Sequence, residues 1–516
     1  MARMRHLAWL LLACACSGGG GSSGPAPPPP PPPAANEVAV SGLSPFASGC
    51  GDAGGIVYIG AEVEPQIAVN PLNPDNLVGV WQQDRWSNGS SRGVLTGVSF
   101  DGGATWTRVQ VAFSQCSGGD AVNGGNYLRS TDPWVSFGPD GTAYQIALST
   151  SGGSFVDGSS NAVRVSRSSD GGRTWTNPAT IQQDTNPFFN DKESITADPN
   201  DARFAYAAWD RLQASGNGPS YFARTTDGGA TWEAARAIYN PGPQSQTIGN
   251  LVRVLPNGTL VNLFARLDNS VSQTQGQVMV IRSSDRGATW SAPILVASLL
   301  PLGARDPTSG QQIRDGSIIP QMAVAPGGTL FVVWQDARFS GTRDAIAISR
   351  STDGGLTWSE PARVNSNPAV PAFTPQVHVR ADGTIGVSYF DLRSDTAAAP
   401  LLTDYWLARS VDGVSWTETH VSGPFDLATA PQSEGGLFLG DYMGLASSGT
   451  TFLPFYTRTT GSIENRTDVF IARIAAGTAS LAYVADDAKR FAPPDPGRVS
   501  ENLRTSASRR VRSGTP

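Results

Sequence analysis

One short string recurs through this chain and constrains its fold more than any other feature. The copies are SFDGGATW at 99–106, SSDGGRTW at 168–175, TTDGGATW at 225–232, SSDRGATW at 283–290, STDGGLTW at 351–358 and a shortened SVDGVSW at 410–416. Their first residues lie 57 to 69 positions apart. A repeat of this length, carried through most of a 516-residue chain, indicates one large repetitive domain rather than several unrelated domains.

Each copy of the string has the chemistry of a tight turn between two strands. The glycines adopt positive φ at little cost, and the aspartate side chain accepts hydrogen bonds from the amides of the turn. The tryptophan then begins the next strand, where its ring is available for burial. We therefore expect the six aspartates to be structural rather than catalytic or metal-binding.

The sequence around the first copy predicts a unit of four short antiparallel strands. They are PQIAVNP at 65–71, LVGVWQQDR at 77–85, GVLTGVSF at 93–100 and ATWTRVQVAF at 104–113. Repeated units of this kind are typical of the blades of a β-propeller, which is an all-β fold. Pairs of strands with the same pattern follow at 132–148, 193–210, 250–268, 320–338, 375–393 and 441–458.

Seven such pairs stand against six turn strings, so the last unit is one strand short. Residues 467–474 supply its third strand, and NEVAVSG at 36–42 is the candidate for the fourth. We favour seven blades closed by pairing of the two chain ends, with six blades as the alternative. In such a blade the start of strand one and the end of strand two share one face of the ring. The six turn strings then lie on the opposite, bottom rim.

The two ends of the chain lie outside the predicted propeller, which spans residues 36–478. Residues 1–14 have a basic start and a short apolar run that ends in Leu-Leu-Ala-Cys, which resembles a bacterial lipobox with Cys14 as the lipidated residue. An ordinary secretory signal is the alternative. Residues 15–35 are rich in glycine, serine and proline and predict a tether. Residues 479–516 predict a disordered tail.

These ends indicate an exported protein, lipid-anchored to the bacterial cell envelope or surface, or secreted if the lipobox is not used. In that oxidising setting Cys50 and Cys116 predict a disulfide. His378 and His420 fall in predicted strands, which argues against a zinc site or a Ser-His-Asp triad. We expect a monomer without a cofactor or a metal, with Ca²⁺ as the one ion that an oxygen-rich ring would suit.

Nucleic acid is excluded as a partner on charge. The net charge is −6, and no basic stripe interleaves with aromatic residues. The membrane is expected to be contacted only through the N-terminal lipid.

Six strings of the form S/T-x-D-x-G-x-T-W in units of blade length resemble the Asp-box (BNR) repeats of the sialidase superfamily. The resemblance covers residues 37–475 and implies a β-propeller. Members of the superfamily include exo-sialidases, other glycoside hydrolases and proteins without catalysis, so the resemblance implies the fold more specifically than the activity. The six strings are called Asp boxes below.

Sialidases carry Arg-Ile-Pro on the first inner strand, two further arginines that clamp the substrate carboxylate, a Tyr–Glu nucleophile pair and an Asp acid/base. Here the corresponding strand begins Glu62-Val63-Glu64-Pro65, with the proline but without the arginine. A carboxylate substrate needs a bidentate arginine clamp. The departure therefore argues against sialic acid as the substrate.

Acidic residues at the starts of the first strands, with Arg314 and Tyr442, are predicted to surround the mouth of the central funnel. Glycoside hydrolysis needs two carboxyl groups in different protonation states, which such a ring would supply. By analogy with the sialidase residues, Glu193 and Tyr442 are candidates for the nucleophile pair and Asp132 for the acid/base. The candidates for substrate binding are Glu64, Arg314, Asp315 and Asp441.

The ends of the second strands repeat a different pattern, in which an aromatic residue precedes aspartate and arginine. It occurs at 81–85, 209–211, 334–338 and 390–393. A single site does not need the same pair in four blades, so we expect salt bridges between blades at these positions.

The sequence as a whole favours a surface-anchored, carbohydrate-active protein, a glycoside hydrolase that acts on an extracellular glycan or glycoconjugate. The alternative is a propeller without catalysis, which binds a glycan or a protein or serves as an envelope scaffold.

Overall fold

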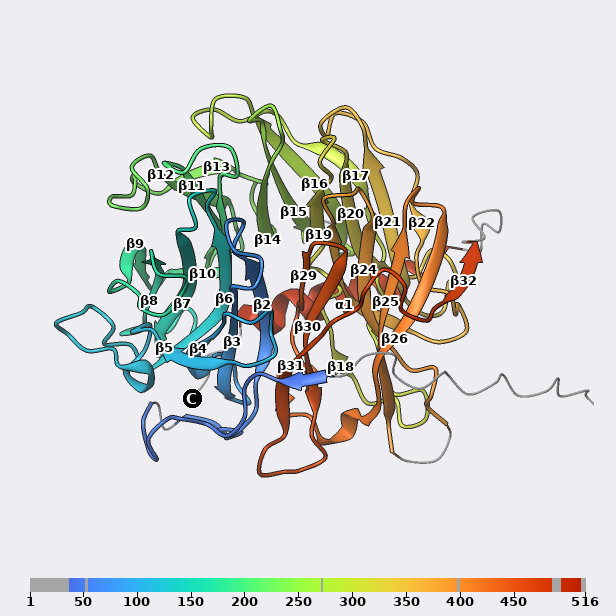
Figure 1. The fold of residues 1–516 in the computed structure, drawn as a ribbon, viewed down its shortest axis with the longest axis horizontal. Helices are drawn as coiled ribbons and strands as arrows, with labels where there is room; N and C mark the ends of the chain where they lie inside the picture. Colours follow the sequence, from blue (N-terminus) through green and yellow to red (C-terminus); the bar gives the residue numbers. More distant parts are fainter. Residues whose placement is uncertain (1–36, 52–53, 271, 397–399, 485–492, 512–516) are drawn as a thin grey trace, which may run out of the picture.

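The computed structural model describes residues 37–511, apart from 52–53, 271, 397–399 and 485–492. Its strands form antiparallel sheets arranged around a common centre, consistent with a β-propeller (Figure 1). Among the described residues, helix is confined to α1 (Pro496–Val511) and two short 3-10 turns, at Gln115–Ser117 and Leu427–Thr429. The predicted lipobox with Cys14 and the tether lie outside the described residues.

Most of the chain forms consecutive sheets of four strands in chain order. The first two units of four strands are joined into one sheet by the pairing of Ser91 with Ser130. They are β2 (Val63–Val69), β3 (Leu77–Arg85), β4 (Ser91–Ser99) and β5 (Thr107–Gln110), then β6 (Arg129–Phe137), β7 (Ala143–Ser151), β8 (Ser160–Ser168) and β9 (Ala179–Thr185). The next two are β10 (Phe188–Ala197), β11 (Ala205–Gln213), β12 (Ser220–Thr225) and β13 (Arg236–Tyr239), then β14 (Ser245–Val254), β15 (Leu260–Asp268), β16 (Gln275–Ser283) and β17 (Ile294–Leu299).

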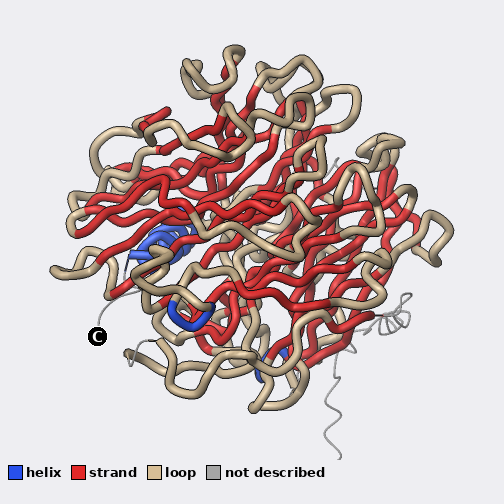
Figure 2. Tube along the Cα trace, turned by 60° about the vertical axis from the view of Figure 1, so that its left-hand side comes forward, coloured by secondary structure: helices blue, strands red, loops and turns tan. Residues whose placement is uncertain are grey.

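The later sheets keep the same order of pairing. They are β19 (Gln321–Val324), β20 (Leu330–Asp336), β21 (Ala345–Ser351) and β22 (Ala362–Arg363), then β23 (Ala372–Val379), β24 (Ile385–Asp391), β25 (Leu402–Ser410) and β26 (Ser415–Asp426). The last consists of β29 (Gly444–Ser448), β30 (Thr451–Thr459), β31 (Thr467–Ala472) and β1 (Glu37–Ala39). The strands run through the body of the molecule, and the loops lie mostly at its edges (Figure 2).

The sheets close on themselves around the centre. Each first strand contacts the first strand of the next sheet, and β29 contacts β2 in turn. The pairing of the two chain ends is confirmed, because β1 pairs with β31 in the register Glu37 to Ala472. Arg458 of β30 strengthens this junction through an ion pair of 2.6 Å with Glu37.

The core lies between adjacent sheets. Several second and third strands place a fully buried tryptophan there, namely Trp81, Trp209, Trp334 and Trp406. A buried indole N–H needs an acceptor, and Trp209 finds one in the side chain of Asn190 at 2.8 Å. The aromatic residue of the repeated pattern at the ends of the second strands is therefore a packing element.

The turn in the first Asp box is held by its own side chains. The Asp101 carboxylate accepts hydrogen bonds from the backbone N–H of Thr105, at 2.9 Å, and from the hydroxyl of Ser99, at 2.8 Å. These donors lower the pKa of Asp101 to about 2, with Thr105 as the largest cause. In the other five strings the aspartate likewise accepts backbone hydrogen bonds within its own turn. This bonding agrees with the structural role that we expect for the six aspartates.

The repeated aspartate–arginine pairs behave in two ways. Arg211 of β11 pairs with Asp184 of β9, at 2.6 Å, and so joins two sheets as expected. Arg338, in contrast, pairs with Asp336 two residues before it. The expectation of one salt bridge between blades at every copy is therefore wrong. An arginine at a strand end can pair with the aspartate two residues before it instead of with an acidic residue of the neighbouring sheet.

The predicted disulfide is present between Cys50 and Cys116. It ties the segment that precedes β2 to the loop that follows β5. Together with the β1–β31 pairing, it fixes the N-terminal part of the described chain to the ring.

The C-terminal segment differs from the prediction of disorder over 479–516. Residues Leu481–Val484 form β32, which pairs with the outer strand β26. Helix α1 buries Val499, Leu503 and Ala507, which are spaced four residues apart and therefore lie on one helix face. This narrow apolar stripe is hidden among polar residues in the sequence, which explains the error. No helix among the described residues is both long enough and apolar enough to cross a bilayer.

Candidate functional site

The first strands of successive sheets share an irregularity at one end. The pairing register shifts between Val63 and Gln66 in β2, between Thr131 and Trp134 in β6, and between Asp191 and Ser194 in β10. Such β-bulges redirect a side chain and are frequent next to active sites. Each of these three first strands therefore presents a redirected residue at the same end of the central channel.

Three of these bulges hold a side-chain-bearing residue in the left-handed region. Glu64 has φ 54°, Asp132 has φ 52° and Lys192 has φ 50°. Glycine adopts this conformation freely, as Gly249 does at φ 71° in β14, but other residues are strained there by about 1–3 kcal/mol each. Thr374, in the corresponding bulge of β23, has the same conformation at φ 50°, so this backbone geometry is a feature of the repeat.

The three side chains meet at one point, where Lys192 is the central cation. Its Nζ lies 2.7 Å from Glu64 Oε1 and 3.0 Å from Asp441 Oδ2, and it also contacts the carboxylate of Asp132. All four side chains are at least 95 % buried. We call Glu64, Asp132, Lys192 and Asp441 the carboxylate–lysine cluster.

Two arginines flank the cluster. Arg314 donates to Asp441 from Nη2 at 2.9 Å and from Nε at 3.3 Å. Arg85 donates to Gln82 at 2.6 Å, and the Gln82 amide in turn contacts Glu64. The predicted binding residues Glu64, Arg314 and Asp441 are thus brought together, each already engaged with another member of the site.

A small sheet covers this end of the channel. It consists of β18 (Ile313–Arg314), β28 (Gly436–Phe438) and β27 (Gln432–Ser433). The guanidinium groups of Arg85 and Arg314 lie 4.9 Å and 4.2 Å from the centre of the Phe438 ring. The funnel mouth predicted from the topology is therefore capped, and the cluster is buried beneath it. We call these three strands the cap.

Tyr442 lies beside the cluster with its hydroxyl engaged. The hydroxyl donates to the carbonyl of Pro133 at 3.1 Å, and the ring lies 5.3 Å from that of Trp134. Burial, followed by the carboxylates of Glu64 and Asp132, raises the pKa of Tyr442 well above its ordinary value. A phenol held protonated in this way is poorly suited to the nucleophile role that the sialidase analogy suggests.

Glu193 differs from the other carboxyl groups of the site. It is 2 % exposed, and neither of its oxygens has a hydrogen-bond partner among the described residues. Burial, and then the charge of Asp132, raise the pKa of Glu193 well above its ordinary value. A cavity of about 20 Å³, lined also by Trp134 and Tyr442, adjoins it. Glu193 is thus a buried acid with a raised pKa, close to an aspartate that is ion-paired with Lys192.

Asp315 lies apart from the cluster, contrary to its predicted role in substrate binding. Its Oδ2 accepts hydrogen bonds of 2.6 Å from the backbone of Ala304 and from the side chain of Gln335. Gln335 also donates to Asp344, whose pKa is raised to about 7 by burial and by the charge of Asp315. The adjacent residue Arg314, which is the last residue of β18, points to the cluster instead and donates to Asp441.

The sequence prediction missed Lys192, Arg85 and Gln82. One signal was available, because Lys192 is the one lysine of the described chain and stands between two acids in Asn-Asp-Lys-Glu. The described residues contain no group of three or more His, Cys, Asp or Glu side chains arranged to hold a metal ion. In this cluster the Lys192 ammonium contacts all three carboxyl groups.

No family model matches this chain. Among solved structures, it is similar to the Hadza microbial sialidase Hz136, with 18 % identity and a TM-score of 0.41 over 81 % of this chain and 66 % of that one. It is also similar to an α-L-arabinanase from Penicillium chrysogenum complexed with arabinobiose, with 14 % identity and a TM-score of 0.46 over 85 % of this chain and 98 % of that one.

A third similar structure is a mutant of Trypanosoma rangeli sialidase that displays trans-sialidase activity. The identity is 12 % and the TM-score 0.44, over 86 % of this chain and 59 % of that one. This chain therefore spans less than two thirds of the length of either sialidase. With every one of these TM-scores below 0.5, the likenesses carry no argument about activity.

Proposed function

We propose that this protein is an exported glycoside hydrolase with a seven-bladed, Asp-box β-propeller fold. The observation that carries the proposal is the contrast between Glu193 and Asp132. Glu193 is buried without a hydrogen-bond partner among the described residues, whereas Asp132 is ion-paired with Lys192. Two neighbouring carboxyl groups held in different protonation states are the chemical requirement of glycoside hydrolysis.

In this proposal Glu193 is the general acid. Its proton passes to the oxygen of the leaving group as the glycosidic bond breaks, and Asp132 acts as the nucleophile or as the base that activates water. The roles expected from the sialidase analogy are thereby exchanged, and Tyr442 becomes a wall of the site. Its aromatic ring, packed on Trp134, offers a face against which a sugar ring can stack.

The cap sets a condition for this chemistry. Because every residue of the carboxylate–lysine cluster is buried, a sugar reaches Asp132 only when the β27–β28 hairpin moves away from Arg85 and Arg314. Both arginines would then turn from the Phe438 ring and from Ser433, to which they donate at 3.4 Å and 3.3 Å. The freed guanidinium groups would be available to hydroxyl groups of the substrate.

The same burial favours the second candidate, a propeller without catalysis. In that case the cluster fastens the first strands of several sheets to one another, and a glycan or protein partner is bound elsewhere on the ring. The lipid anchor at Cys14 and the location at the cell envelope belong to both candidates, whereas a carbohydrate partner belongs to the hydrolase and to a glycan-binding propeller.

The two candidates are separated by measuring product release from aryl-glycosides, including a sialoside, and from polysaccharides. The purified protein is compared with Glu193→Gln and Asp132→Asn, and with Asp382→Asn as a control on a partly exposed carboxylate outside the cluster. We expect release from a neutral glycoside, lost in the first two variants and kept in the control. Release that persists in Glu193→Gln contradicts the assigned roles, and sialoside turnover contradicts the argument from the missing first-strand arginine. Absence of release from every substrate favours the binding propeller.

A further inference from the structure

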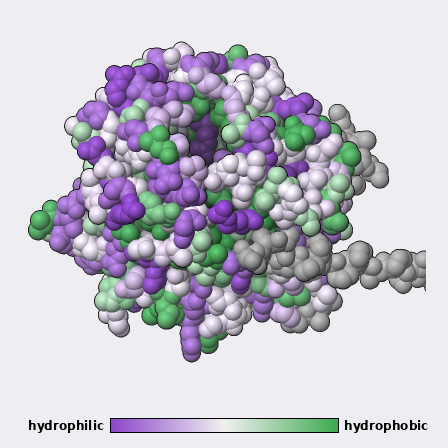
Figure 3. Space-filling view, viewed as in Figure 1, coloured by the Kyte–Doolittle hydropathy of each residue, from purple (hydrophilic) through white to green (hydrophobic). Residues whose placement is uncertain are grey.

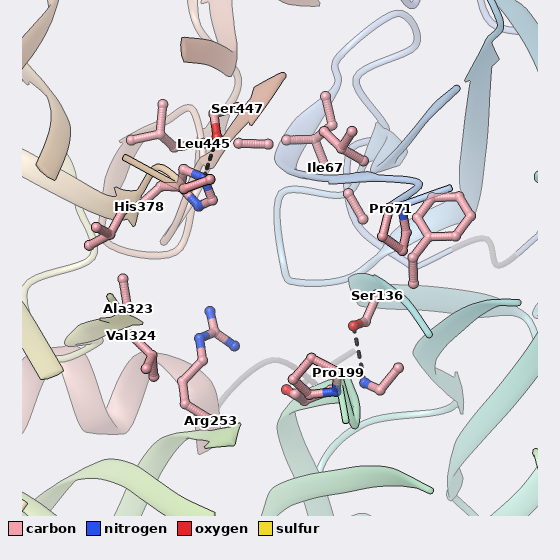
Figure 4. A pocket seen from close by; sticks show the side chains of 18 of the residues that line it. Ile67, Pro71, Ser136, Pro199, Arg253, Ala323, Val324, His378, Leu445 and Ser447 are labelled. Carbon is pink, nitrogen blue, oxygen red and sulfur yellow. Dashed lines mark hydrogen bonds between the residues drawn. The ribbon is translucent and has the colours of Figure 1, made fainter. Parts of the chain in front are cut away.

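A second site candidate lies at the other end of the central channel. A cavity of about 790 Å³ opens there, between the far ends of the first strands and the turns that follow them. The surface is hollowed at the upper middle of the view in Figure 3, and Figure 4 shows the cavity from close by. Its volume lies within the range of about 300–1,000 Å³ that is typical of small-molecule sites.

The wall of this cavity is mostly apolar and carries a single permanent charge. Ile67, Ala323, Val324 and Leu445 contribute apolar surface from different sheets (Figure 4). The residues that line it include no aspartate, glutamate or lysine, and Arg253 is the one arginine among them. A ligand in this cavity therefore meets a positive group in an apolar surrounding.

The Arg253 side chain extends from β14 into the cavity (Figure 4). Its Nε donates to the carbonyl of Met322 at 2.9 Å, and its Nη1 donates to that of Val252 at 3.2 Å. A guanidinium has five N–H donors, so these two bonds leave donors for a ligand. The backbone bonds also hold the group in place, which favours binding of a planar oxyanion.

Among the described residues, no carboxylate forms an ion pair with Arg253. Burial lowers the pKa of Arg253 to about 10, and no acidic residue opposes that shift. Other arginines of this fold are held in two ways: Arg314 is paired with Asp441, whereas the fully buried Arg164 donates to backbone carbonyl groups. The Arg253 side chain is only partly buried, so its guanidinium is accessible to an anionic ligand that enters the cavity.

His378 adds a second polar group to the wall without adding a charge. Its Nε2 lies 2.9 Å from the Ser447 hydroxyl. Burial, and then the charge of Arg253, lower the pKa of His378 to about 4. The imidazole is therefore neutral near pH 7, and Arg253 alone sets the sign of the cavity.

We propose that this cavity binds a small organic anion, whose carboxylate or phosphate group pairs with Arg253 and whose apolar part lies against the channel wall. The site is separate from the carboxylate–lysine cluster. Trp134 lines the inner end of the cavity and packs on Tyr442, so it divides the two. The proposal goes beyond the proposed hydrolase activity and stands whether or not that activity is found.

The test is the affinity of the full chain for three probes, measured by titration calorimetry. They are 4-phenylbutyrate and phenyl phosphate, which present the two oxyanions on a similar apolar body, and 4-phenylbutanol as the uncharged match. We expect one-to-one binding of at least one anion and weaker binding of the alcohol. Comparison of the two anions distinguishes a carboxylate site from a phosphate site.

The variant Arg253→Gln removes the charge and is expected to weaken anion binding roughly 10- to 100-fold, as for loss of a hydrogen bond to a charged group. The control Arg203→Gln removes an arginine that is exposed and paired with Asp201, on the turn between β10 and β11. We expect the control to bind as the unaltered protein does. Equal anion affinity in Arg253→Gln, or no anion binding at millimolar concentrations in the unaltered protein, overturns the proposal.

A further measurement covers the case in which Arg253→Gln does not fold. Anion affinity of the unaltered protein is measured at increasing ionic strength and compared with that of Arg253→Lys, which keeps a charge but loses the planar fork. We expect affinity to fall with salt and to be lower in Arg253→Lys. Affinity that is independent of salt and equal to that for the alcohol overturns the proposal.

Discussion

Replacement of Lys192 by methionine is the perturbation that most directly tests the carboxylate–lysine cluster. Methionine has nearly the length of lysine without its charge, so the variant keeps the volume and removes the cation. It leaves the carboxyl groups of Glu64, Asp132 and Asp441 facing one another beneath the cap. Their repulsion, together with the loss of the attraction to Lys192, acts against the folded state.

The magnitude follows from the distances. Two unit charges separated by 2.7 Å or 3.0 Å attract by about 6 kcal/mol at an effective dielectric constant of about 20. The desolvation of lysine, which the variant no longer undergoes, offsets much of this attraction. Removing one partner of a buried ion pair typically costs about 3–5 kcal/mol, and with three carboxylates around one ammonium we expect Lys192→Met to lie at the upper end of that range.

The loss of stability should depend on pH. Burial and the neighbouring carboxylates already raise the pKa of Glu64 to about 8, from 4.5, and Lys192 opposes that shift. Without the lysine the carboxyl groups take up protons more readily. In both proteins the raised folded-state pKa gives stability that is present below pH 4.5 and lost as pH rises, and the loss runs in parallel until the Glu64 of the unaltered protein ionises near pH 8. The comparison therefore extends from pH 4.5 to beyond pH 8, and the deficit of the variant should be constant at first and grow above pH 8.

The assay is urea unfolding of the two proteins at several pH values in this window. Arg266→Met is the control, because Arg266 pairs with Asp268 at 3.1 Å and both side chains are partly exposed; we expect it to cost about 1 kcal/mol or less. The double variant with Glu64→Gln should lose less than the sum of the two single variants, since both act on one pair. A deficit for Lys192→Met as small as that of the control, or one that does not change with pH, refutes the reasoning.

Three further predictions concern the scaffold. Replacing both Cys50 and Cys116 by alanine opens a loop with a sequence separation of 66 and should lower the free energy of unfolding by about 4 kcal/mol. Urea unfolding measures this loss, and an unchanged midpoint would mean that the disulfide contributes little to stability. Leu503→Ala, at a fully buried position of α1, should cost about 2–5 kcal/mol and expose the helix amides to hydrogen exchange, whereas unchanged protection would show that α1 is not docked. The pKa of Asp101 is lowered from 3.8 to about 2, so its contribution to stability is present above pH 3.8 and lost as pH falls to 2. The variant Asp101→Asn should therefore unfold with a weaker dependence on acid pH. An identical dependence of stability on pH in the two proteins would contradict the role of this turn.

The Asp-box turns show that part of this fold depends only on residues close together in the chain. Asp101, Ser99 and Thr105 are neighbours in the chain and bond to one another in the structure. A motif of this kind is readable because its partners are a few residues apart, and the same holds for the four strands of each unit. The pairing of β1 with β31 was predictable for a different reason, since counting strands left one unit incomplete.

The candidate site was predictable only in part. The topology placed Glu64, Asp132, Arg314 and Asp441 at one end of the channel, and the structure brings these four together. It does not follow from topology that Lys192 stands at their centre, because that depends on the bulge that turns its side chain inward. Asp315 shows the converse. It directly follows Arg314 in the chain, but its side chain bonds to Gln335 and not to the carboxylate–lysine cluster.

Features that depend on contacts between near neighbours, or on counting strands and cysteines, could be predicted from the residues: the six turns, the four-stranded units, the disulfide partners and the all-β class. Features that depend on the closing of the ring could be seen only in the folded molecule. Glu64 and Asp441 are 377 residues apart and share a hydrogen bond. The cap joins β18 to β28 across more than a hundred residues. Arg253 has no acidic partner among the described residues, because the other sheets contribute no aspartate or glutamate to the cavity. A local hydrogen bond depends on residues that are neighbours in the chain, and these can be recognised in the sequence. The balance of charges in the central channel depends on the side chains that every sheet contributes to it.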